Sequence, residues 1–456
     1  MAQATWTEPT NSAPPRRGTG GLVFALCLLG ICASLIARMF EMSEDTFNVW
    51  GALLIGPMLF AISLPILSRE ARKLGDRKLM KVFTLALLCM FAGALIRYFV
   101  TYEIYDGQAD ASGYHGKGSI IAEQISSGEL GRSLESFTRT DFIRFFTGVV
   151  YFLIGPSRLG GFLFYSWLAF WGLFLFFKAF LVAVDTGDSK SYGNLVFFYP
   201  SLLYWPATIG KDAWMVLWLG LASLGVAHAM KGRTFQGLSM VAGGLALAGI
   251  VRVPVAGMAG VGLAMAYVIR KPSEKLKGLG PIVKIASIAL MIGLIAFMIK
   301  WSGDFLNADL SNPASVSATL EQTSSRADHG GSQFDPIVVT SPHHVPMAIV
   351  TVLYRPFFFE AHNLQALIAA VEGMILLVLT IVRWRWIIAA FKKIRSNPYV
   401  LYAAVFSLIF IIAFASFPNF GLLARQRVQL FPLLFVLFCI PPGGKDEREL
   451  DRAQSS

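Results

Sequence analysis

Two carboxylates in a run of small residues form the first candidate site. Asp106 and Asp110 lie in YDGQADASGYHGKG (105–118), and Tyr114 and His115 follow them. A positioned carboxylate can take a proton from a hydroxyl or bind a hard metal ion, and small neighbours let a bulky substrate approach the backbone. An ordinary polar loop with turn glycines is the structural alternative. The segment predicts a general base at Asp110 or Asp106, with substrate contacts from Tyr114 and His115.

Cations recur in three further polar segments, two of which also hold carboxylates. The residues are Lys211 and Asp212, then Arg355, Glu360 and His362, then Arg425 and Arg427. A guanidinium presents a fork of N–H donors that matches phosphate oxygens, so the arginines predict anion recognition. A lysine at the positive end of a helix is unfavourable unless an anion lies nearby, and we expect Lys211 in such a position. Arg252, beside Pro254, is a weaker candidate of the same kind.

Each of these residues also has an ordinary structural explanation. The helix dipole favours Asp212 as a cap, Arg355 and Glu360 could form a structural ion pair, and Arg425 and Arg427 could extend to lipid headgroups. The histidines do not have the spacing of a helical metal pair, so they are assigned no metal. The sequence names no certain cofactor, although the aspartate pair of the first segment would suit Mg²⁺ or Mn²⁺.

The elements that position these residues are predicted to be membrane spans. Of 456 residues, 55% are hydrophobic and only 15% are charged, whereas a soluble domain carries roughly a quarter charged residues. A span needs about 20 mostly apolar residues, and twelve segments qualify. They are 21–39, 47–67, 80–100, 160–182, 193–209, 212–230, 235–251, 254–270, 280–300, 364–383, 398–416 and 422–440. The sequence therefore predicts an all-α polytopic integral membrane protein with about twelve transmembrane helices.

The net charge of +11 reports orientation and not a nucleic-acid partner. Lys and Arg concentrate in the loops at 69–81, 270–277 and 383–395, and such loops stay in the cytoplasm. The segments 101–157 and 301–362 are then two large extracytoplasmic loops, with an interfacial helix over 142–155. We expect a transmembrane domain over 21–440 in a bacterial cytoplasmic membrane. The tails 1–20 and 441–456 are then both cytoplasmic, the first of them disordered.

The order of the polar motifs resembles a known superfamily. Asp-Ala-x-x-Tyr-His (110–115) is followed by FYPSLLYWPATIGKDA (198–213), RPFFFEAHN (355–363) and NFGLLARQR (419–427). This order is similar to that of bacterial multispanning glycosyltransferases of the C-type (GT-C) superfamily, whose donors are polyprenyl-phosphate sugars. The resemblance implies that Asp110 is the catalytic base, with Asp106 second. It also implies that the phosphate side is formed by Lys211, Arg355, Arg425 and Arg427.

A carboxylate opposite cations suits sugar transfer from a phosphate-linked donor. Because soluble nucleotide sugars are not found outside the cytoplasmic membrane, the donor would be a polyprenyl-phosphate sugar. The acceptor would be a glycan or a lipid-linked glycan, and the transfer would be inverting. The reaction would belong to cell-envelope or exopolysaccharide synthesis. Membrane lipids and envelope-polysaccharide assembly proteins would be further partners. The alternatives are an O-antigen or exopolysaccharide polymerase, a transporter or flippase of lipid-linked sugars, and a scaffold. The centres of the predicted spans are nearly free of charge, which counts against a transporter. The sequence also has no Walker motif, which counts against ATP-driven transport.

Overall fold

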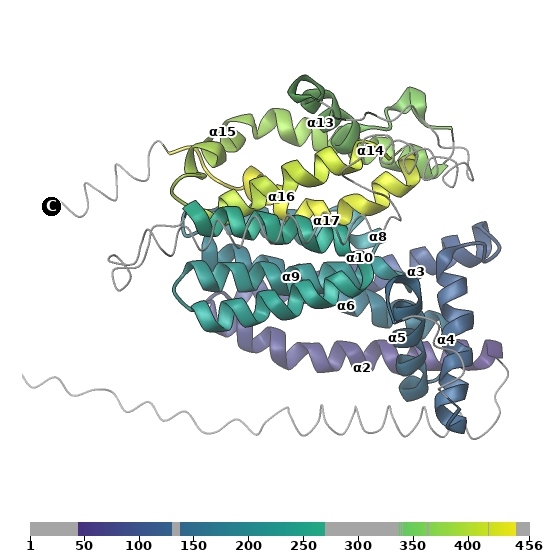
Figure 1. Ribbon diagram of the computed structural model, residues 1–456. Coiled ribbons are helices and arrows are strands. Elements are labelled where there is room, and N and C mark those ends of the chain that lie inside the picture. The colour runs from purple at the N-terminus through teal and green to yellow at the C-terminus, as the bar shows by residue number, and fades with distance from the viewer. Residues whose placement is uncertain are drawn as a thin grey trace, which may run out of the picture.

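The computed structural model describes residues 44–129, 137–269, 337, 339, 341–362, 364–417 and 419–443. The described residues form helices and contain no β-strand. Eight long helices run roughly along one direction and form the body of the molecule (Figure 1). They are α2 (Glu44–Lys73), α3 (Arg77–Phe99), α6 (Arg158–Ala183), α9 (Lys211–Met230), α10 (Thr234–Ile269), α14 (Leu364–Val382), α16 (Pro398–Phe414) and α17 (Phe420–Phe438).

Shorter helices connect and cover this body. A π-helical turn, η1 (Val100–Ile104), extends α3, and α4 (Asp110–Ser127) and α5 (Arg139–Ile154) cross one end of the body (Figure 1). The others are α7 (Ser189–Phe198), α8 (Pro200–Tyr204), η4 (Pro342–His344), α13 (Val345–Tyr354), η5 (Phe358–Glu360) and α15 (Trp384–Lys393). The predicted interfacial segment 142–155 is thus helical as α5, and it packs against α4. Much of the expected outer loop 101–157 is also helical.

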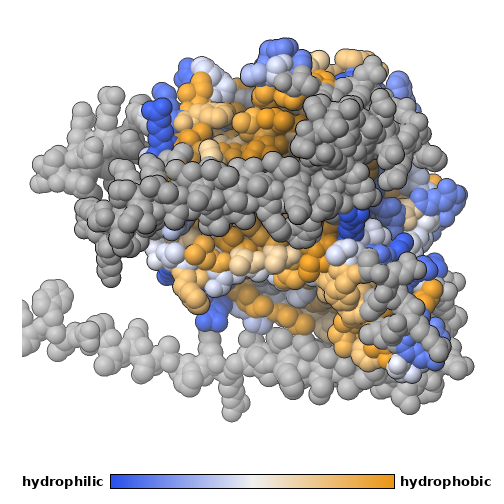
Figure 2. Space-filling view, viewed as in Figure 1, coloured by the Kyte–Doolittle hydropathy of each residue, from blue (hydrophilic) through white to orange (hydrophobic). Residues whose placement is uncertain are grey.

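The expectation of a polytopic membrane protein is confirmed in its coarse form. Within the described residues, seven helices, with α10 counted once, are long and apolar enough to cross a membrane, and α15 with α16, bent by 116°, would make an eighth. On the face shown in Figure 2, apolar residues form a band along the helices and polar residues lie toward the ends. The predicted total of twelve is not confirmed, and the segments 21–39 and 280–300 lie outside the described residues.

The segment 193–209 was predicted as one span, and this prediction is wrong. It forms α7 and the five-residue α8, followed by irregular backbone up to Gly210. Proline explains the break: Tyr199, before Pro200, is extended with ψ 130°, as steric contact with a following proline favours. A second proline, Pro206, lies where the helix would otherwise continue. The site loop before α9 is therefore irregular backbone inside the bundle.

The predicted segment 235–251 and the described part of 254–270 both lie in α10, which is interrupted at Arg252 (φ −140°, ψ 83°). A Cβ on Gly260 would lie 3.9 Å from Cδ1 of Leu245, although about 22 Å would separate these positions along a straight helix. The chain therefore reverses direction at Arg252, and the two arms of α10 correspond to the two predicted segments. Arg252 lies at the tip of this hairpin.

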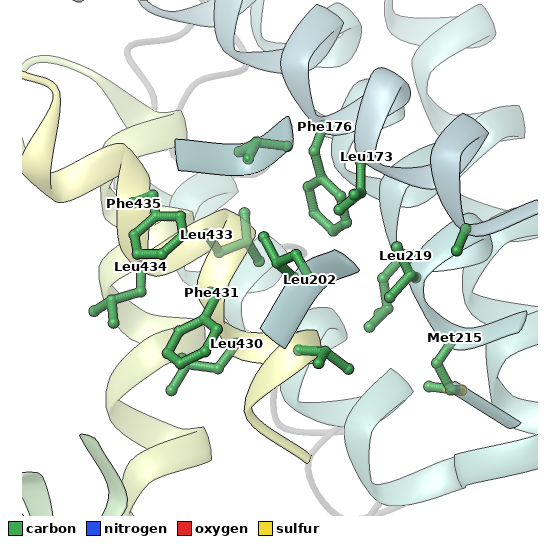
Figure 3. Close-up of a cluster of buried hydrophobic side chains, with 14 of the residues drawn as sticks. Leu173, Phe176, Leu202, Met215, Leu219, Leu430, Phe431, Leu433, Leu434 and Phe435 are labelled. Atoms are coloured by element: carbon green, nitrogen blue, oxygen red, sulfur yellow. The ribbon is translucent and has the colours of Figure 1, made fainter. Parts of the chain in front are cut away.

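The core joins α6, α9 and α17 around α8, as Figure 3 shows for Leu173, Leu202, Leu219 and Phe431. At the crossing of α6 and α9, a Cβ on Gly172 would collide with the backbone of Val216. Small residues let two helix backbones approach closely in a membrane. This close contact fixes the position of α9 in the bundle.

The two ends of the bundle differ in their polar contacts. At one end, which we call the basic end, Lys178 pairs with Glu70, and Lys231 pairs with Asp185. The basic segments 69–81, where α2 turns into α3, and 383–395, which is mostly helical as α15, both reach this end, where Lys393 donates to Thr186. The helices α4, α5 and α8 lie at the opposite end (Figure 1), which we call the site end.

Candidate functional site

Four charged residues at the site end form one chain of ion pairs, here called the charge cluster: Asp110, Asp212, Arg252 and Arg425. Arg252 donates from Nη1 to Oδ1 of Asp212 at 2.9 Å, and Arg425 donates from Nε to Oδ2 of the same carboxylate. The Nη1 of Arg425 also donates to Oδ2 of Asp110 at 2.6 Å. Arg425 therefore links a carboxylate of α9 to one of α4.

Each member of the charge cluster is placed by the end of a helix or by a turn. Asp110 and Asp212 stand in the first turns of α4 and α9, where the helix dipole favours a negative charge. Arg252 lies at the tip of the α10 hairpin. Arg425 is five residues beyond Phe420, the first residue of α17. Residues far apart in the sequence thus meet at one point because several helix ends meet there.

Burial separates the roles of the two carboxylates. The side chain of Asp212 is 1% exposed, whereas that of Asp110 is 64% exposed. Both oxygens of Asp212 accept from arginines, so this residue holds Arg252 and Arg425 side by side. A buried carboxylate shared by two guanidiniums is a positioning residue, and Asp110 is the member of the cluster that a substrate can reach.

Tyr114 and Lys211 lie next to the charge cluster, and both interact electrostatically with its four members. A Cβ on Gly210 would lie 3.6 Å from the ring of Tyr114 and 3.7 Å from Nη2 of Arg425. Gly210 therefore lies directly beside both side chains. Burial raises the pKa of Tyr114 to about 12, with Arg425 opposing that shift, so its phenol stays neutral at physiological pH. Lys211 donates from Nζ to Oγ1 of Thr140, near the start of α5, at 2.7 Å.

Two predicted residues of the first segment stand apart from the cluster. His115 is buried, and its Nδ1 lies 2.9 Å from the hydroxyl of Tyr151, which ties α4 to α5. Asp106 is exposed in a left-handed turn (φ 47°) before Gly107 (φ 73°). Its carboxylate forms no ion pair with any described residue. The structure brings Asp110, and not Asp106, to the arginines.

The segment 355–362 forms a second group on another side of α17. Arg355 donates from Nε to both carboxylate oxygens of Glu360, at 2.9 and 3.2 Å, as the structural alternative anticipated. Burial would raise the pKa of Glu360, but hydrogen bonds from Arg355 and from the Phe357 N–H outweigh it and lower that pKa. Arg427 donates from Nη2 to the carbonyl of Arg355, and His362 is exposed.

The predicted phosphate-side residues therefore divide between two groups. Arg425 and Arg427 are two residues apart, which turns their side chains about 200° from each other around the axis of α17. Arg425 joins the charge cluster, and Arg427, 1% exposed, joins the group of Arg355. Asp110, Lys211 and Arg425 come together as one site, and Arg355 does not belong to it.

Sequence reasoning missed Glu372, a buried carboxylate in the middle of α14. Its Oε1 accepts from the backbone N–H of Ser201 at 2.9 Å, its Oε2 accepts from the Ser201 hydroxyl, and it is 5% exposed. The expectation that span centres are nearly free of charge is wrong at this position. A lone carboxylate in an apolar run was the available signal.

Among the described residues, no group of three His, Cys, Asp or Glu side chains is placed to hold a metal ion. Both carboxylates of the charge cluster contact arginines instead. This donor set suits an anion held by guanidinium groups. The binding of Mg²⁺ or Mn²⁺ stays a prediction.

Comparisons with protein families, with characterised proteins and with solved structures find no match for this chain.

Proposed function

We propose that the protein transfers a sugar from a polyprenyl-phosphate carrier to a glycan or lipid-linked acceptor on the extracytoplasmic face of a bacterial membrane. The observation that carries the proposal is the position of Arg425 between buried Asp212 and exposed Asp110. Asp212 holds the guanidinium of Arg425 on its buried side. The N–H group that now contacts Asp110 can turn to a phosphate oxygen, because guanidinium matches both kinds of anion.

The proposed step moves one bond and one proton. The acceptor hydroxyl oxygen attacks the anomeric carbon of the donor, and the bond from that carbon to the phosphate oxygen breaks. The polyprenyl phosphate leaves with the bonding electrons, held by Arg425 and Lys211. Asp110 accepts the acceptor proton and later passes it to water. Phosphate binding to Arg425 would leave the Asp110 oxygens free to take this proton.

The sidedness of the site supports the extracytoplasmic assignment. The charge cluster lies at the end of the bundle opposite the loops 69–81 and 383–395. Loops rich in lysine and arginine stay in the cytoplasm. A lipid-linked donor in the outer leaflet could then reach the cluster from the membrane.

Transport of lipid-linked sugars is the second candidate, and Glu372 and Arg427 favour it. Both are buried charges within helices that are long enough to span the membrane, and such residues often mark transport pathways. The contacts of Glu372 with the start of α8 also explain it as a structural residue. The open carboxylate of Asp110 beside Arg425 supports transfer over transport.

The test uses the purified protein in lipid nanodiscs with synthetic polyprenyl-phosphate sugars. We expect Asp110→Asn to lower the transfer rate strongly while it keeps donor binding, because the variant loses the proton acceptor and retains Arg425. Arg425→Gln should lose donor binding. Glu123→Gln, which removes an exposed carboxylate from the same helix α4, is the matched control and should transfer normally. Passage of donor across the bilayer without transfer would support the transporter instead.

A further inference from the structure

A further cation at the site end, Arg97, lies outside the charge cluster and is held against two aromatic rings. Its guanidinium carbon lies 4.7 Å from the ring centre of Tyr204 and 4.9 Å from that of Trp205. Its Nη1 donates to the Tyr204 hydroxyl at 2.8 Å, and its Nε is buried without a hydrogen-bond partner. Among the described residues, no carboxylate pairs with Arg97. The charge is therefore fixed in place, and no described carboxylate neutralises it.

Close packing of α3 against α8 places Arg97. A Cβ on Gly93 would collide with the carbonyl oxygen of Leu203, so this glycine lets α8 approach the backbone of α3. Residues four apart lie on the same face of a helix, and Arg97 is four residues beyond Gly93 in the direction of the site end. Its guanidinium consequently packs against the rings of Tyr204 and Trp205.

Arg97 also borders the surface that faces lipid. Leu95, Ile96 and Phe99 around it are 52%, 56% and 57% exposed, and all four residues belong to a helix long and apolar enough to span the membrane. An unneutralised charge at such a border is costly. Extension of the side chain toward water is the usual solution, but the buried Nε and the ring contacts hold this guanidinium against the protein.

A small hollow with a volume of about 20 Å³ adjoins this arginine through Trp205. Trp205 and Phe420 line it together with the small residues Ala366, Ala369, Gly421 and Ala424. Gln365 also lines it and accepts from the Tyr105 hydroxyl at 3.4 Å. On α14, Leu367 and Ile368, next to the lining residues, are 43% and 59% exposed. The hollow is therefore apolar and lies beside the lipid-facing surface.

This hollow is separate from the charge cluster. Ala424 lines the hollow, and Arg425, the next residue of α17, points about 100° away around the helix axis. Arg425 contacts Asp110 and Asp212, which do not line the hollow. The site end thus presents two cationic positions, one on each side of α17.

We propose that Arg97, Tyr204 and Trp205 bind the phosphate or pyrophosphate headgroup of a second membrane lipid, with the first carbons of its chain in the hollow. The arginine supplies the charge, and the tyrosine hydroxyl, which now accepts from it, can donate its own proton to a phosphate oxygen. The identification of this lipid as the acceptor rests on the proposed function. The binding of an anionic lipid at Arg97 does not.

The test measures equilibrium binding of farnesyl phosphate to the full chain in phosphatidylcholine nanodiscs, with Arg425→Gln as the starting protein so that the charge cluster does not contribute. Loss of a hydrogen bond to a charged group weakens binding by about tenfold or more, which is the effect expected when Arg97→Gln is added. Arg158→Gln is the matched control, because Arg158 also contacts an aromatic ring, that of Tyr102 at 5.4 Å, and does not line the hollow. Unchanged affinity in Arg97→Gln would overturn the site.

Two further arms complete the experiment. Ala369→Leu fills the hollow and keeps Arg97, so it should weaken binding of farnesyl phosphate even if Arg97→Gln fails to fold; unchanged binding in this variant would remove the hollow from the proposal. Inorganic phosphate at equal concentration should not compete, and full competition would show a site for free phosphate instead of lipid. In transfer assays, Arg97→Gln should raise KM for the acceptor alone. Lipid binding at Arg97 without any transfer by wild type would reject the proposed function and leave the lipid site standing.

Discussion

Replacement of Asp212 by Asn tests whether one buried carboxylate holds the charge cluster together. Asp212 is 1% exposed and accepts from both Arg252 and Arg425, whose side chains are each 15% exposed. The substitution leaves two nearly buried guanidiniums side by side without their shared counter-ion, and it turns an N–H₂ group toward donors that need an acceptor. Removal of one partner from a buried ion pair costs about 3–5 kcal/mol. Because Arg425 keeps its contact with Asp110, we expect the free energy of unfolding to fall by about 3 kcal/mol.

The assay is the free energy of unfolding in mild detergent, with donor binding measured on the same samples. Asp185→Asn serves as the control, because Asp185 pairs with Lys231 at the basic end with a side chain that is 72% exposed, and an exposed pair contributes about 0–1 kcal/mol. Asp212→Asn should lose both stability and donor affinity, whereas Asp185→Asn should keep both. Equal stability of the two variants would refute the positioning role of Asp212.

Three further outcomes follow from contacts outside the charge cluster. The pKa of Glu360 is lowered by Arg355 and by the Phe357 N–H. The ion pair therefore stabilises the fold at pH values above the pKa of the unfolded carboxyl, and this contribution is lost as the pH falls through the lower pKa of the folded state. The free energy of unfolding, measured from pH 7 to 3, should show this loss in wild type and not in Glu360→Gln. Glu372→Gln should destabilise the protein by about 1–3 kcal/mol in denaturant unfolding, since a carboxylate that accepts twice from Ser201 is replaced by an amide; wild-type stability would show that these bonds do not hold α8. Gly93→Val should separate α3 from α8 and lower the unfolding temperature more than Gly116→Val on α4, where a Cβ meets open space.

Several long apolar runs were predictable as helices, and α2 and α17 are helical although they contain prolines. The segments 160–182 and 212–230 correspond closely to α6 and α9, because twenty apolar residues in a membrane have few alternatives to a helix. The segment 193–209 is equally apolar, and its prolines place extended backbone where a span was expected. Hydropathy alone could not decide that case, because the sequence does not show that this backbone lies inside the bundle.

The candidate site was predictable in its members and only partly in its grouping. Asp110, Lys211, Arg355 and Arg425 were grouped because all four were expected on the outer side. The structure pairs Arg425 with Asp110 and places Lys211 close enough to interact with both, whereas Arg355 belongs to another group. Helical periodicity already separates Arg425 from Arg427 by about 200°, so this division was available from the sequence. Arg252 was named as a weaker candidate, and the predicted spans 235–251 and 254–270 already implied a turn there, but its contact with Asp212 was not available from the sequence. Arg97 likewise depends on contacts with α8 that no sequence spacing reveals.

The central claim is that Asp110 competes with the donor phosphate for Arg425 and then accepts the acceptor proton. The most direct measurement is single-turnover transfer from a synthetic polyprenyl-phosphate sugar by wild type and Asp110→Asn, with donor affinity determined in parallel. We predict that Asp110→Asn lowers the transfer rate by about 10²–10⁴-fold while it binds the donor at least as tightly as wild type, because a neutral Asn competes less for Arg425. A wild-type transfer rate in Asp110→Asn would contradict the account.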